Sequence, residues 1–288
     1  MDRADAEAVA LRCHQTLEPL HSMVYFAPEV EQAFVDAGLK QGRMCYFAGR
    51  AAPLGPVGAG MVTATFYNFS PELVARHVPR AWGLVEPDEV VKLRFAKAGE
   101  ALRRLLGDEA ADSAELAELA GLVREAAEGC TPEGRPLYAA HADLDRPTDP
   151  VTALWHDITL LREFRGDGHI AALVAEGMSG LHALVTHTAT GEGFNEQAAK
   201  ATRGWSDAEW SAAEADLREQ GVLDTAGGLT ERGRAWRARI EEHTNAVATG
   251  PYRHIGPEKA ARIAELGRDF ARTALKAGAI PRELFDRS

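Results

Sequence analysis

Apolar residues recur at intervals of three and four along most of the chain, which is the spacing of amphipathic α-helices. Glycine and proline make residues 52–60 a predicted loop, and Ser70 followed by Pro71 predicts the start of a helix with Ser70 as its N-cap. The expected fold class is therefore mainly α. The other helices that the pattern predicts cover residues 5–26, 28–37, 42–51, 92–106 and 113–128.

The densest group of polar residues inside an apolar pattern lies between Leu154 and Gly177. Apolar stripes before and after the Gly-Asp-Gly at 166–168 predict two helices with a sharp break between them. We expect Asp167 to cap the second helix near His169, and Gly166 to end the first. The charged residues around this break make it a candidate site.

Segments of the first half recur in the second half in the same order. The two best pairs are separated by 139 and 136 residues along the chain. Because these separations are nearly equal, the sequence predicts an ancestral duplication. The alternative is that Ala- and Leu-rich amphipathic helices resemble one another through composition alone. The aligned segments are 33–39 with 172–178, 68–74 with 204–210, 83–85 with 221–223, and 94–106 with 229–241.

The duplication predicts a division into two pseudo-repeats. Residues 1–128 form the first repeat, the proline-rich segment 129–150 is a linker, 151–250 form the second repeat, and 251–288 form a C-terminal helix. Each repeat is expected to be a helical bundle with a winged helix.

The second repeat carries the clearer winged-helix pattern. A helix capped by Ser206, a tight turn at Gly227-Gly228 and the long helix 229–241 follow in the order of helix, small β-wing and helix, which resembles the module of MarR-type regulators. Two such modules in one chain would mimic the dimer of these regulators. A cleft between the halves is then the expected ligand site.

The charges of this module do not favour DNA binding. A recognition helix needs cations or amides towards bases and phosphates, and each acidic residue there is repelled by the phosphates. The predicted wing at 224–228 has no cation, and the whole chain has a net charge of −11. We therefore expect the winged helices to act as scaffolds. The helix 206–220 carries Asp207, Glu209, Glu214, Asp216 and Glu219 against Arg218 alone.

Composition excludes several other classes of protein. The first twelve residues are charged throughout and have no apolar core of a signal peptide, and no run of about 18 apolar residues predicts a membrane span. The three cysteines are scattered, which argues against a disulfide framework and a zinc–cysteine site. We expect a cytoplasmic protein.

Several motifs spread over nearly the whole chain resemble an actinobacterial family of helix-turn-helix-like proteins. The resemblance implies a helical, winged-helix-containing fold, and it implies no particular activity. Two residues depart from the expected pattern, since His156 stands where we expect Gln and Asn245 where we expect Asp. The matching motifs are HSMVYFAPE at 21–29, YFAGRAAPLGPV at 46–57, FYNFSPELV at 66–74, GRPLYAAH at 134–141, LLREFRGDGHIAALVAEG at 160–177, TRGWSDAEW at 202–210 and GLTERGRAWRARIEEHT at 228–244.

Two histidines are the candidate catalytic residues. His21 shares a helix face with Tyr25, so the pair can line a pocket and move a proton, although a buried histidine satisfied by the backbone fits the same pattern. His169 beside the predicted helix break is the second candidate proton donor. His156 and Glu163 lie about 10 Å apart along one helix, too far to share a metal ion. No metal site is expected and no cofactor is named, while haem ligation by a lone His21, His169 or His187 stays open.

The candidate ligand-binding residues include an arginine in an apolar segment. Arg50 must contact a ligand anion or a structural partner, and Glu29 and Glu163 are the partners we consider. Arg165 is an expected anion clamp. The full set of expected ligand-binding residues is Tyr25, Arg50, Trp155, His156, Arg165, Asp167 and His187.

The sequence therefore predicts a cytosolic protein that encloses a small organic ligand between its two halves, and an enzyme of specialised metabolism is one form this could take. The alternative is a ligand-responsive winged-helix transcriptional regulator, and a scaffold without ligand is a third interpretation. A homodimer is compatible with each of them.

Overall fold

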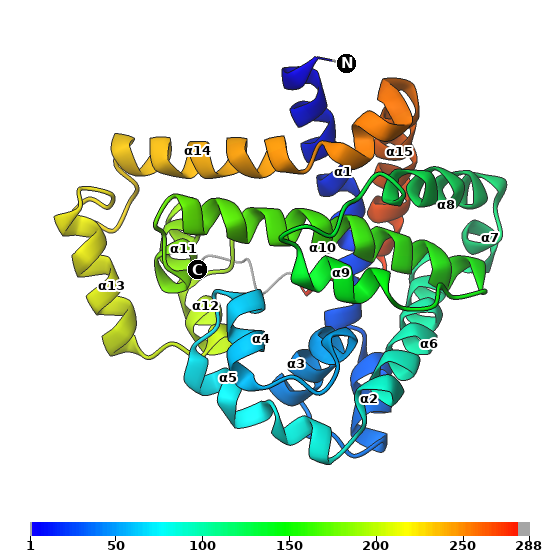
Figure 1. Cartoon of the computed structure of the whole chain (residues 1–288), viewed down its shortest axis with the longest axis horizontal. Coiled ribbons are helices and arrows are strands. Elements are labelled where there is room, and N and C mark those ends of the chain that lie inside the picture. Colours follow the sequence, from blue (N-terminus) through cyan, green and yellow to red (C-terminus); the bar gives the residue numbers. More distant parts are fainter. Residues whose placement is uncertain (1, 282–288) are drawn as a thin grey trace.

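The computed structural model describes residues 2–281, and this part of the chain is mainly helical, as the apolar pattern predicts (Figure 1). Within these residues the only β-pairing outside the helices is an isolated antiparallel bridge between Leu223 and Leu229. No helix of the described chain is long and apolar enough to cross a membrane. The helices of the first half are α1 (Arg3–Ser22), α2 (Pro28–Asp36), α3 (Arg43–Ala51), α4 (Ala59–Phe66), α5 (Pro71–His77), α6 (Pro87–Leu106), α7 (Asp108–Ala111) and α8 (Ala114–Ala127).

Helix α10 (Pro150–Ala175) is the centre of the fold, and α1, α6, α8 and α9 pack around it together with α14. Every residue from Val151 to Thr159 is buried, as expected of a helix enclosed on all sides. The remaining helices of the second half are α9 (Pro136–Ala142), α11 (Gly180–Ala189), α12 (Glu196–Arg203), α13 (Asp207–Glu219), α14 (Glu231–Val247) and α15 (Gly250–Lys276).

The predicted helix break at 166–168 is wrong, because α10 runs through it without interruption. The packing of α10 outweighs the weak helix propensity of its glycines. Gly168 instead allows the side chains of Arg135 and Val247 to lie close to the α10 backbone, since a Cβ at this position would lie 2.7 Å from both Arg135 Nη1 and Val247 Cγ2. Asp167 therefore cannot cap a helix beginning near His169.

Asp167 caps a different helix. Its carboxylate accepts hydrogen bonds from the backbone N–H groups of Leu137 and Tyr138, both at 2.9 Å, at the start of α9. Helix α9 lies within the segment 129–150 and buries Leu137, Tyr138 and His141 against the body of the protein. A side chain in the middle of α10 thus fixes the position of α9.

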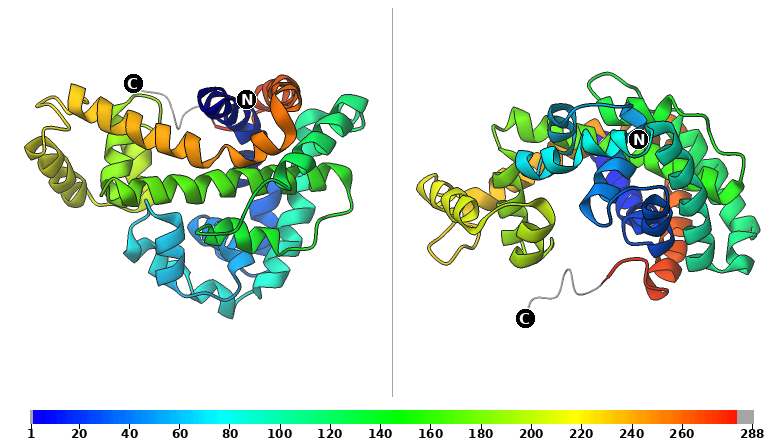
Figure 2. Two further views of the ribbon diagram at one scale, coloured as in Figure 1. Left: turned by 45° about the horizontal axis from the view of Figure 1, so that its top comes forward. Right: turned by 90° about the horizontal axis from the view of Figure 1, so that it is seen from below.

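Helices α11, α12 and α13 and the turn before α14 form a unit with its own apolar cluster, which includes Leu184, Trp210 and Leu217. Ser206 begins α13 as predicted, in a capping box with Glu209. Figure 1 and Figure 2 both place α13 at one end of the molecule, far from α7 and α8.

The chain ends by returning to its beginning. Helix α15 packs along α1 and α8 and contains a kink at Gly256, where φ is 80°. The expected C-terminal helix 251–288 corresponds to α15 up to Lys276. Residues 282–288 of that prediction lie outside the described part of the chain.

Candidate functional site

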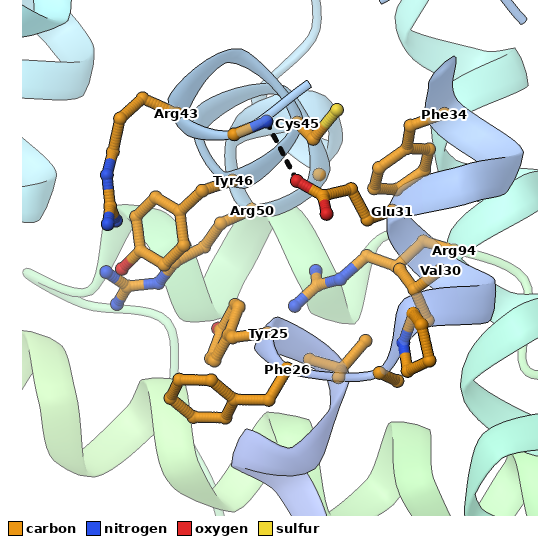
Figure 3. A pocket seen from close by; sticks show the side chains of 15 residues that line it. Tyr25, Phe26, Val30, Glu31, Phe34, Arg43, Cys45, Tyr46, Arg50 and Arg94 are labelled. Atoms are coloured by element: carbon orange, nitrogen blue, oxygen red, sulfur yellow. Dashed lines mark hydrogen bonds between the residues drawn. The ribbon is translucent and has the colours of Figure 1, made fainter. Parts of the chain in front are cut away.

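A cavity of about 260 Å³ opens between α2, α3, α6 and the turn that follows α1. We name it the Arg94 cavity. Figure 3 shows the Arg50 and Arg94 side chains reaching into it beside the ring of Tyr25. Its lining combines arginines with aromatic rings and one carboxylate, Glu31, which accepts a hydrogen bond from the Gly42 N–H at 2.8 Å. The arginines and aromatic residues are Tyr25, Phe26, Phe34, Arg43, Tyr46, Arg50 and Arg94.

Arg94 is a buried cation whose partners are neutral. It is 4% exposed, its Nη1 lies 3.1 Å from His141 Nε2, and its guanidinium stacks over Trp155 at 5.0 Å from the ring centroid. His141 Nδ1 lies 2.8 Å from the carbonyl oxygen of Leu137, so Nδ1 donates there and Nε2 accepts from Arg94. Burial, followed by the Arg94 charge, lowers the pKa of His141 to about 3, which keeps this acceptor neutral.

The second guanidinium nitrogen of Arg94 is unsatisfied. Among residues 2–281 its Nη2 has no hydrogen-bond partner, and no carboxylate lies within ion-pair distance of Arg94. A buried charge without a counter-charge is energetically costly.

Arg50 pairs with Glu163, one of the two structural partners that we considered from the sequence. Its Nε and Nη2 donate to the Glu163 carboxylate at 3.1 and 2.8 Å, and Arg162 Nη1 donates to the same carboxylate at 3.0 Å. Glu29, the other partner considered, pairs with Arg104 instead. Two guanidinium groups therefore share the single charge of Glu163.

Tyr46 is a site residue that our sequence analysis missed. Its ring lies 5.2 Å from that of Tyr25, and it lines the Arg94 cavity. Burial raises the pKa of Tyr46, but Arg50, Arg203 and Arg162 lower it more, so the net direction is down. Its i, i+4 spacing from Arg50 on a predicted helix was the available signal.

His21 lies behind this cavity rather than on its wall. Thr159 Oγ1 donates to the Trp155 carbonyl, so His21 Nδ1, at 3.0 Å, donates to Thr159 Oγ1. The other ring nitrogen then accepts from the Tyr25 hydroxyl at 3.1 Å. Burial and Arg162 lower the pKa of His21 well below its ordinary value, so the ring is neutral and hydrogen-bonded on both sides. It reaches the cavity only through Tyr25.

A second cavity, also of about 260 Å³, lies between α3 and α4 on one side and α10, α11, α12 and α14 on the other. We name it the interhalf cavity. It contains His169 and His187, and Tyr46 and Arg50 line it as well as the Arg94 cavity. His169 Nδ1 donates to Thr244 Oγ1 at 2.9 Å, since that hydroxyl itself donates to the Ile240 carbonyl. Burial lowers the pKa of His169 to about 3.

Four of the predicted ligand-binding residues line neither cavity. Trp155 is buried and donates from Nε1 to the His21 carbonyl at 3.2 Å, and Asp167 caps α9. Arg165 pairs with Glu241 at 3.4 Å, and His156 is buried with its ring edge-on to Phe95. Residues 2–281 hold no group of three or more potential ligands around a metal ion.

The surface of α13 is acidic. Asp207, Glu209, Asp216 and Glu219 are exposed. Arg218, its sole cation, donates to Glu214 at 3.1 Å and to the Asp224 carbonyl at 3.3 Å. The Arg218 charge is thus already paired within the protein and does not offset the acidic residues of α13. A phosphate backbone would therefore repel α13.

Comparison with known proteins gives one match. A family model described as a helix-turn-helix family matches residues 10–281, which is nearly the whole chain. Neither the curated proteins nor the solved structures contain a match. The chain therefore belongs to the helix-turn-helix family.

Proposed function

We propose that this protein binds a small organic anion in the Arg94 cavity. The observation that carries the proposal is the Arg94 guanidinium, which lines the cavity, is buried, lacks a carboxylate partner in the described chain, and has no hydrogen-bond partner for Nη2. A ligand carboxylate would supply the missing counter-charge and a charge-assisted hydrogen bond. Removing Arg94 should therefore abolish binding.

The cavity walls indicate the class of anion. Tyr25, Phe26, Phe34 and Tyr46 present aromatic rings, and aromatic surfaces bind flat apolar groups well. A cavity of about 260 Å³ is small beside common ligand sites, which span roughly 300–1,000 Å³. These properties favour a compact aromatic or unsaturated carboxylate.

An internal duplication with winged-helix modules used as scaffold is part of this proposal. Equivalent helix ends support it, since Leu39 N–H donates to the Phe34 carbonyl and Met178 N–H donates to the Leu173 carbonyl, both at 2.9 Å and at the same offset of 139.

Contacts between equivalent turns support the duplication as well. Ser70 N–H donates to the Arg203 carbonyl, and Trp205 Nε1 donates to the Asn68 carbonyl, both at 2.9 Å. Under the offset of 136, these contacts join the equivalent turns of the two halves. A near-reciprocal contact of this kind is expected at the two-fold interface of a dimer.

The test uses benzoate as probe. Thermal unfolding and calorimetric titration with benzoate should show binding to the wild type and loss of it in Arg94→Gln. Lys92→Gln is the matched control, because it removes a positive charge two residues away at an exposed position of the same helix. Equal benzoate binding by Arg94→Gln and wild type contradicts the proposal.

A catalytic role of His21 and His169 remains a prediction. A substrate in the Arg94 cavity would meet Tyr25 and Tyr46 first, and His21 would act through the Tyr25 hydroxyl. Alanine at His21 should then remove turnover, whereas alanine at His169 should do so only for a substrate in the interhalf cavity, which His169 lines. Only variants that keep the wild-type melting temperature test these two roles.

A ligand-responsive transcriptional regulator is the second candidate, and family membership favours it. The charge of α13 opposes it, since Asp207–Glu219 contains five acidic residues and one arginine, which gives 1 − 5 = −4. A mobility-shift assay with the gene's own upstream DNA, at low and at physiological salt, separates the two functions. Specific retardation that weakens with salt would establish the regulator.

A further inference from the structure

The interhalf cavity has features that the proposed function does not use. It is built from both halves of the chain, with α3 and the α4–α5 turn on one side and α10, α11, α12 and α14 on the other. Four arginines line it, from helices that are far apart in sequence: Arg50, Arg162, Arg203 and Arg237.

The charges around this cavity do not balance. Glu241 is the one acidic side chain of its lining, and Glu163 neutralises one charge of Arg50 and Arg162 from behind. Glu18 lies 3.6 Å from Arg162, so four guanidinium groups face three carboxylates, which leaves 4 − 3 = +1. The cavity therefore offers a net positive charge to an anionic group.

Two of these arginines also have donors without partners. Within the described chain, the buried Nε–H groups of Arg203 and Arg237 donate to no acceptor, and Arg237 is only 9% exposed. The contact of Arg237 with Glu241 is long, at 3.5 Å. A guanidinium with a free Nε–H beside a cavity can bind a planar or tetrahedral oxyanion in a forked geometry.

The backbone of Tyr67 is an independent sign of a built site. Tyr67 has φ of 61°, a conformation rare outside glycine, and it lines the cavity. Its hydroxyl donates to the Met178 carbonyl at 2.5 Å, so contact with the other half holds this conformation in place. Strained residues that the surrounding structure maintains are concentrated at functional sites.

Apolar side chains line the cavity as well, and the guanidinium groups of Arg50 and Arg203 stack over the rings of Phe66 and Phe69, at 4.5 and 4.6 Å from the ring centroids. Phe66 and Phe69 face the cavity from the first half, and Ile170, Leu173 and Leu184 face it from the second. The occupant thus has an organic part as well as its charged group. A free inorganic anion would leave this apolar surface in contact with water.

We propose that the interhalf cavity is a second ligand site, separate from the Arg94 cavity, which takes the phosphate group of a small organic phosphate monoester. Arg203 and Arg237 bind the phosphate oxygens, and the apolar side chains of the lining contact the organic group. Because the lining comes from both halves, the ligand ties the α11–α14 unit to the first half. Binding should therefore stabilise the whole protein rather than one half.

The probe is phenyl phosphate, with benzoate and potassium chloride at matched ionic strength as comparison. Phenyl phosphate should raise the melting temperature of the wild type by several degrees at saturation, and its ³¹P signal should broaden. Arg237→Gln and Arg203→Gln should each lose at least tenfold in affinity. Arg232→Gln is the matched control, since Arg232 is exposed on α14 and no ion pair involves it in the described chain.

Arg94→Gln separates this proposal from the proposed function. It should keep phenyl phosphate binding while benzoate binding is lost. Two results would overturn the second site. One is loss of phenyl phosphate binding in Arg94→Gln, and the other is unchanged phenyl phosphate binding in both interhalf-cavity variants, Arg203→Gln and Arg237→Gln, when these are folded. If both cavity variants unfold, the ³¹P signal of the folded wild type decides, and a signal that stays sharp at millimolar protein overturns the proposal.

Discussion

Glu163 allows a quantitative test of the charge arrangement inside the protein. We consider the substitution Glu163→Gln, which keeps the size of the side chain and removes its charge. The carboxylate is fully buried, the Arg50 side chain is 9% exposed, and Arg162 is the second cation on the same carboxylate. The variant leaves Arg50 without its counter-charge, and Arg162 with Glu18, at 3.6 Å, as its remaining acidic partner.

Removing one partner of a buried ion pair costs about 3–5 kcal/mol. The upper half of this range applies here, because one carboxylate serves two cations. Large single domains lose roughly 2–4 °C in melting temperature per kcal/mol, so the lower end already gives a fall of about 6–12 °C. The exposed pair of Glu29 and Arg104 is the matched control, and Glu29→Gln should cost about 1 kcal/mol or less.

The pH dependence checks the origin of this effect. Burial raises the pKa of Glu163, but Arg50 and Arg162 lower it more, so its pKa lies well below the ordinary value. A depressed carboxyl pKa stabilises the fold above the pKa of the unfolded chain, about 4.3, and this contribution is lost as pH falls through the folded pKa. The difference between wild type and Glu163→Gln should therefore be full at pH 7 and shrink in acid.

Chemical denaturation of the wild type, both single variants and the double variant Arg50→Gln/Glu163→Gln measures the coupling. Residues in direct contact should show a coupling of roughly 1–3 kcal/mol, so the double variant should lose less than the sum of the single losses. A loss below about 1 kcal/mol in Glu163→Gln, or simple additivity, would refute our assignment of an essential buried counter-charge.

Three further tests use substitutions in other parts of the fold. Burial raises the pKa of Asp167 from 3.8 to about 6, so the stability of the wild type should fall relative to that of Asp167→Asn as pH rises from 3.8 to about 6. Asp167→Ala should cost about 1–2 kcal/mol, because the α9 cap is lost. Urea unfolding measures both effects. A Cβ at Gly180 would lie 2.0 Å from the Tyr67 carbonyl oxygen, so Gly180→Ala should lower the melting temperature sharply, whereas Gly121→Ala, with open space around it, should stabilise α8 by about 0.5–1 kcal/mol. Arg94→Met should raise the melting temperature of the ligand-free protein, because it removes an unpaired buried charge, and a lower value would show that Arg94 is already neutralised.

Most helices of the first half could be predicted from local apolar spacing, but α4 begins at Ala59 inside the predicted loop 52–60, and α6 begins at Pro87 rather than at residue 92. The predicted boundaries 28–37 and 42–51 differ from α2 and α3 by one residue at most. The break predicted at 166–168 failed for a non-local reason, since helices distant in sequence enclose α10 and stabilise its glycines. The glycine content of the local sequence does not show that distant helices will surround this segment.

The candidate site was predictable only where a residue looked misplaced in its own segment. Arg50 stands in an apolar helix, so a buried partner was expected, and Glu163 is that partner. Arg94 sits in a segment rich in charges and looks like a surface residue. Its burial depends on Trp155 and on His141, which lies 47 positions away and belongs to a helix that Asp167 positions. No local pattern carries that information.

The shared carboxylate also links the two cavities. Arg50 lines both cavities and Arg162 lines the interhalf cavity, while Glu163 neutralises each of them in part. A negative ligand in one cavity should weaken binding of a second anion in the other, and thermodynamic reciprocity makes the two effects equal. Removing the charge of Glu163 should then have opposite effects on stability and on binding. Glu163→Gln should bind benzoate and phenyl phosphate more tightly than the wild type while it melts at a lower temperature. Weaker binding of both anions by the folded variant would mean that Glu163 positions Arg50 for the ligand rather than competing with it.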